Sequence, residues 1–174
     1  MTYVPHGFAD PPAPTRRGLV LAGGEAALLV AASAVGAPRS DAEMLGGLLS
    51  MERRLEAAYE ASLRHSALDE QLALSLRDQE REHVRGLEQL LAARGRQAPS
   101  APSGDRRLAR ALANPEAFGR YALALEGRAV SAYVDVAAGV GDVELLEALG
   151  AIMTSEAQHR VALRRALRGW LLGV

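Results

Sequence analysis

Two stretches of this chain decide its fold: residues 79–91 read QEREHVRGLEQLL, and residues 155–167 read SEAQHRVALRRAL. Each carries Glu-x-x-His inside a run whose apolar residues recur every three or four positions, which is typical of an amphipathic helix. The pattern places Glu80 and His83, and likewise Glu156 and His159, on the apolar face where leucine is expected. An unpaired charge on a buried face is costly, so these four residues need partners.

Two further helical segments carry a carboxylate on the apolar face. MERRLEAAY at 51–59 resembles LEGRAVSAY at 125–133, and Glu126 follows Glu52 by 74 residues, while the two Glu-x-x-His pairs lie 76 residues apart. Tyr59 and Tyr133 occupy equivalent places, two turns beyond these glutamates. The chain therefore looks like two copies of one helix pair.

The helix signals predict an all-α four-helix bundle. The expected helices run from a capping box at Ser40 to about residue 64, from 68 to 94, from Asn114 to about 139, and from Asp142 to about 169, with one short helix at 106–113. The connections are short, long and short, which predicts two antiparallel helix pairs and a long crossover between helices 2 and 3. No segment alternates with the period of a strand.

The charges on the four inward faces point to metal. The chain has no lysine, and no arginine lies on these faces. Two divalent cations would balance four carboxylates, and oxygen and imidazole ligands suit iron, manganese or zinc. One Glu from each of two helices, with Glu-x-x-His from each of the other two, is the ligand set of dimetal carboxylate bundles.

With this ligand set, residues 40–170 resemble the ferritin-like superfamily. The resemblance implies a di-iron centre, with manganese as the alternative. Its implied ligands are Glu52, Glu80, His83, Glu126, Glu156 and His159. Glu80 and Glu156 would bridge both metals, Glu52 and His83 would complete one metal, and Glu126 and His159 the other. Tyr59 and Tyr133 are expected to lie next to the ligands, where they could hydrogen-bond a ligand or donate an electron. The alternative is that both are ordinary core tyrosines.

The resemblance also implies a reaction with O₂ or peroxide, most simply oxidation of Fe(II) or removal of peroxide. The chain has no cysteine, so a rubredoxin-type site is absent and the reductant is expected to be a separate electron donor. Arg81 stands where bacterioferritin has its haem-ligating methionine, so no haem is expected. Two alternatives stay open: a metal-free or weakly metal-binding helical scaffold, and an iron-storage cage subunit. The di-iron oxidase is expected to act as a monomer or as a homodimer.

The composition of the chain excludes several classes of partner and cofactor. The net charge is −1 and aromatic residues make up 4%, without a basic block beside stacking residues, so no nucleic acid is expected to bind. The absence of cysteine excludes disulfides, a thiol nucleophile and iron–sulfur clusters.

Residues 1–37 are expected to be separate from the bundle domain at 38–174. TRRGLVL at 15–21, followed by an apolar run to Ala37, resembles a twin-arginine export signal, which predicts an exported, extracytoplasmic protein cleaved after Ala34 or Gly36. One alternative is an uncleaved anchor that contacts the membrane through residues 18–37. The other is a disordered tail with an extra helix on a cytoplasmic protein.

Overall fold

The computed structural model describes residues 40–100 and 104–172, and side chains as far as residue 169. The predicted export segment at 1–37 lies outside the described residues, so it stays a prediction. Across the described ranges, no helix combines the length and the apolar character needed to cross a bilayer.

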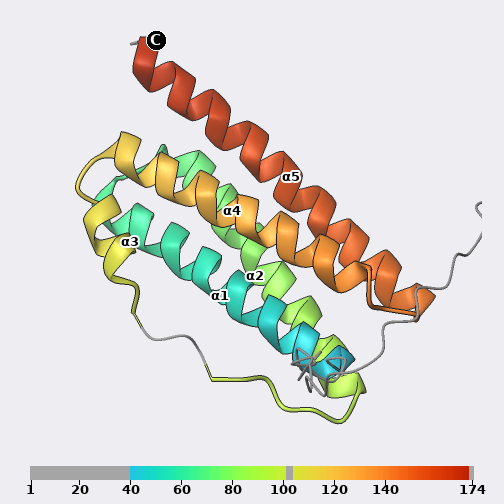
Figure 1. Ribbon diagram of the computed structural model, residues 1–174. Coiled ribbons are helices and arrows are strands. Elements are labelled where there is room, and N and C mark those ends of the chain that lie inside the picture. The colour runs from blue at the N-terminus through green and yellow to red at the C-terminus, as the bar shows by residue number, and fades with distance from the viewer. Residues whose placement is uncertain (1–39, 101–103, 173–174) are drawn as a thin grey trace, which may run out of the picture. The chain divides into compact units, whose positions relative to one another are not determined.

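The described residues form five helices and no strand, which confirms the all-α prediction. Four long helices lie along one another and a short helix occupies the crossover (Figure 1). The helices are α1 Asp41–His65, α2 Glu70–Ala93, α3 Arg106–Ala111, α4 Pro115–Ala137 and α5 Val143–Leu172.

Side-chain caps mark where the helices begin. Ser40 and Glu43 form the predicted capping box at the start of α1, and Asn114 accepts a hydrogen bond from the backbone N–H of Ala117 at the start of α4. The second helix begins at Glu70, later than predicted, because the Asp69 side chain accepts from a backbone N–H of the first turn and makes Asp69 the N-cap. The last helix runs beyond the predicted end at residue 169, to Leu172.

Packing joins the helices in the predicted pairs. The closest packing is α1 against α2 and α4 against α5, while α1 also packs on α4 and α3 on α4. The buried apolar residues form two clusters. On α1, for example, Leu48 belongs to one cluster and Leu55 to the other, and Glu52 lies between them. The inward carboxylates therefore occupy a polar layer between two apolar layers.

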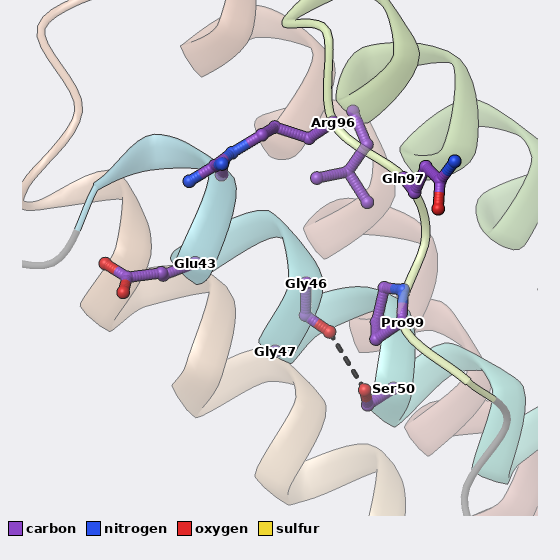
Figure 2. A pocket seen from close by; sticks show the side chains of 9 residues that line it. Glu43, Gly46, Gly47, Ser50, Arg96, Gln97 and Pro99 are labelled. Carbon is purple, nitrogen blue, oxygen red and sulfur yellow. Dashed lines mark hydrogen bonds between the residues drawn. The ribbon is translucent and has the colours of Figure 1, made fainter.

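The start of the long crossover packs against α1. Figure 2 shows Pro99 lying beside Gly46 and Ser50, and the Pro99 ring is 3.9 Å from the position that a Cβ at Gly46 would take. Arg53 donates a hydrogen bond to the carbonyl of Pro99 and forms an ion pair with Glu88 of α2 at 2.8 Å. One arginine thus links α1, α2 and the start of the crossover.

Candidate metal centre

The structure brings all six predicted ligand residues together in the middle of the bundle. They form two groups, and within each group one ligand atom per residue lies within 4.8 Å of the others. The first group is Glu52, Glu80, His83 and Glu156; the second is Glu80, Glu126, Glu156 and His159. The residues common to both groups are therefore the two glutamates that the resemblance gave as bridging.

The centre is removed from water by the four long helices. Every one of its glutamates has an exposed fraction of 0%, and they come from α1, α2, α4 and α5. The two imidazole rings stack with their centroids 5.8 Å apart. Four carboxylates at this depth are strongly unfavourable unless something compensates their charge.

The polar atoms of this cluster lack partners, and this is the observation that tests whether the residues suit a metal. Eight of its oxygen and nitrogen atoms are buried without a hydrogen bond. Six are glutamate oxygens and two are imidazole nitrogens: Glu52 Oε2, both oxygens of Glu80 and of Glu156, Glu126 Oε2, and Nδ1 of His83 and His159. The closest approaches, His83 Nδ1 to Glu156 and His159 Nδ1 to Glu80, are 2.9 Å each. Lone pairs that converge in this way, on oxygen and imidazole nitrogen, fit first-row divalent cations.

Burial and mutual repulsion disturb the protonation of the cluster. Burial raises the pKa of Glu52 to about 8 and that of Glu156 to about 11, against the opposing effect of His83. Burial also tends to raise the pKa of Glu80, but the two imidazoles have the larger effect and lower it. Burial lowers the imidazole pKa values, yet the carboxylates prevail and raise His83 to about 12 and His159 to about 9. Without a cation, the cluster therefore retains protons that free side chains would release.

The two predicted tyrosines contact the centre across the halves of the chain. Tyr59 on α1 donates a hydrogen bond to Oε1 of Glu126 on α4, and Tyr133 on α4 donates to Oε1 of Glu52 on α1 at 2.7 Å. Burial, reinforced by the neighbouring carboxylates, raises the pKa of both phenols well above the usual value. Both tyrosines therefore remain protonated donors, each holding the glutamate of the opposite helix pair.

Sequence reasoning missed two residues that contact a predicted ligand. Nε2 of His159 lies 3.3 Å from the amide oxygen of Gln79 and 3.2 Å from the hydroxyl of Ser155. A donor N–H on Nε2 leaves Nδ1 free to bind a metal, which is the usual arrangement of ligating histidines. The signal was available, because Gln79 and Ser155 immediately precede Glu80 and Glu156 and are equivalent in the repeat.

The comparisons with known proteins agree with the fold of the described residues. No curated protein matches the chain. A solved structure, a conserved hypothetical protein from Mycobacterium tuberculosis, is similar in fold, with a TM-score of 0.64, 21% identity, and coverage of 72% of this chain and 95% of that one. The sequence matches the ferritin-like domain family over residues 40–169, which span all four long helices except the end of α5. The chain therefore belongs to the ferritin-like family.

Proposed function

We propose that this domain binds two iron ions, or two manganese ions, and reacts with O₂ or peroxide. The observation that carries the proposal is the set of buried carboxylate and imidazole atoms that converge without hydrogen-bond partners. In this proposal Glu80 and Glu156 hold both ions. Glu52 and His83 complete the first position, and Glu126 and His159 the second.

Charge balance supports a pair of divalent ions. The four glutamates carry four negative charges when ionised, and among the described residues they form ion pairs with His83 and His159 and none with an arginine. Metal binding would displace the protons that the cluster otherwise retains and offset the cost of burying the carboxylates. One divalent ion would leave half of this charge uncompensated.

The residues around the centre orient the ligands and keep water out. When bound, a pair of divalent iron ions supplies the electrons that reduce O₂ or peroxide. Tyr59 and Tyr133 hold one oxygen of Glu126 and of Glu52, which directs the other oxygen of each carboxylate into the centre. The amide oxygen of Gln79 accepts a hydrogen bond from Nε2–H of His159 and fixes that ring.

The simplest reaction for such a site is oxidation of Fe(II), with O₂ or peroxide as the electron acceptor. Repeated turnover needs a separate electron donor, because the chain has no cysteine to hold a rubredoxin-type iron. Neither the homodimer nor export through residues 1–37 is needed for this chemistry, and both remain predictions.

Anaerobic loading with Fe(II), followed by addition of O₂ or peroxide, tests this function. We expect about two iron ions per chain, both oxidised within the first turnover, seen as growth of Fe(III) absorbance. Sedimentation velocity on the same sample separates a small oligomer from a storage cage. A chain that retains no iron under these conditions would refute the function and leave the scaffold hypothesis.

Removing the tyrosine hydroxyls is expected to weaken metal binding without unfolding the bundle. Tyr59→Phe and Tyr133→Phe each leave a buried carboxylate oxygen without its donor, and outer partners of metal ligands typically contribute about 10–100-fold to affinity. Titration with Mn(II), followed by electron paramagnetic resonance of the free ion, measures the effect.

Tyr121→Phe is the matched control for this pair. Its hydroxyl donates to Asp105 at 2.9 Å, away from the six ligands, so the substitution is expected to leave Mn(II) affinity unchanged. Equal affinities in all three variants would show that the two buried tyrosines are ordinary core residues.

A further inference from the structure

The two proposed metal positions are covered unequally. The His83 side chain is 10% exposed, whereas that of His159 is 3% exposed and the glutamates are at 0%. Nε2 of His159 is held by Gln79 and Ser155, but no described residue hydrogen-bonds Nε2 of His83. The His83 ring is therefore the point at which the centre approaches the surface.

A pocket of about 520 Å³ lies at this point, between α2 and α5. His83 forms part of its wall, and most of the remaining wall is apolar. The other lining residues are Glu82, Gly86, Gln89, Leu90, Ala93, Ala148 and Ile152. The helices α2 and α5 pack on each other much less closely than the partners within each helix pair, which leaves room for the pocket.

The internal repeat explains why the pocket stands on one side of the centre. The two Glu-x-x-His pairs are separated by 76 residues, and with the same spacing Ala148 is equivalent to Leu72 in the first half and Gly86 to Ala162 in the second. Leu72 packs against the apolar cluster that includes Leu76 and Leu163. The side of the centre that carries the pocket therefore has the smaller residue at both positions, Gly86 on α2 and Ala148 on α5, and the missing volume lies beside His83.

We propose that this pocket binds an uncharged, largely apolar organic molecule next to the His83 side of the centre. The wall offers Leu90, Ala93 and Ile152 as apolar contacts, and Glu82 and Gln89 are exposed. An anion is disfavoured because the exposed carboxylate of Glu82 stands on the wall. The pocket thereby assigns a ligand class to the centre, and in this sense the proposal rests on the proposed function.

Variants that fill the pocket test the proposal. Ala148→Leu introduces the residue that the other half of the repeat already carries, and Gly86→Leu adds a side chain where a Cβ meets nothing within 4 Å. The control is Gly150→Leu, on the same helix as Ala148, because its Cβ position is equally open and it does not line the pocket.

The probe is N-phenyl-1-naphthylamine, an uncharged aromatic amine whose fluorescence rises in apolar surroundings. We expect saturable binding to the metal-free wild type, at least tenfold weaker in both filling variants and unchanged in Gly150→Leu. Absence of saturable binding, or binding that the filling variants do not weaken, would overturn the proposal. Loss of a dimer in Ala148→Leu, without probe binding to the wild type, would also overturn it and assign this face to a second copy of the chain.

A second readout connects the pocket to the centre. In protein loaded with Mn(II), the proton resonances of the bound probe are expected to broaden relative to the metal-free protein, and the Gly150→Leu control should behave in the same way. Probe binding to a chain that takes up no metal would refute the proposed function but not the pocket. Metal uptake without probe binding would refute the pocket but not the function.

Discussion

Replacing Glu80 and Glu156 together by alanine is expected to reduce the metal content from about two ions per chain to none. Both residues belong to both ligand groups, so the double substitution removes two carboxylates from each proposed position. The two remaining ligands of each position do not hold a divalent ion against a chelator. The measurement is iron or manganese per chain by mass spectrometry after anaerobic loading and desalting.

A matched pair of acidic residues controls for lost charge. Glu56 and Glu88 are partly exposed on the same two helices as Glu52 and Glu80, and they pair with Arg81 at 2.9 Å and Arg53 at 2.8 Å. Glu56→Ala/Glu88→Ala is expected to keep its metal. The version Glu80→Gln/Glu156→Gln keeps the side-chain volume and should lose metal while retaining the helical circular dichroism of the wild type. Full metal content in that variant would refute the assignment of these two glutamates.

Raising the pH from 6 to 9 is expected to destabilise the metal-free domain. His159 has a pKa of about 9 in the fold against 6.5 in the unfolded chain, so its stabilising effect is complete below pH 6.5 and is lost as the pH rises toward 9. The pKa of Glu52 is raised from 4.5 to about 8, so the folded chain keeps a proton that the unfolded chain releases. The stability that this proton contributes is therefore also lost as the pH rises toward 8. The depressed pKa of Glu80 acts only below 4.5 and lies outside this window.

The size of this pH effect is set by the number of protons retained. One such group contributes about 1.4 kcal/mol per pH unit, so a loss of about 3 kcal/mol or more is expected across this range. Thermal unfolding followed by circular dichroism, with a chelator present, measures it. A flat profile between pH 6 and 9 would show that the buried cluster does not retain protons.

Metal loading is expected to reverse this instability. An ion that binds only the folded state, at a thousand times its dissociation constant, stabilises it by about 4 kcal/mol. For a domain of this size that raises the melting temperature by roughly 10–20 °C. The same addition to Glu80→Ala/Glu156→Ala should leave the melting temperature unchanged. A comparable rise in that variant would mean that the ions stabilise the protein from another site.

The sequence by itself determined which residues face inward. Helical periodicity places Glu52, Glu80, Glu126 and Glu156 among apolar residues, and capping residues such as Ser40 and Asn114 mark where helices start. These are local properties, since the face of a residue depends only on its own helix. The start of α2 is also a local property, because Asp69 caps the helix by the same rule.

Only the tertiary structure decided which surrounding residues contact the six ligand residues across helices. That Tyr59 reaches Glu126, that Gln79 reaches His159, and that Ala148 leaves a pocket beside His83 all depend on how far one helix is shifted and rotated against another. Periodicity within one helix carries no information on that shift. It is set by the packing of large side chains such as Leu48, whose fit against the other helices exists only once the bundle has formed.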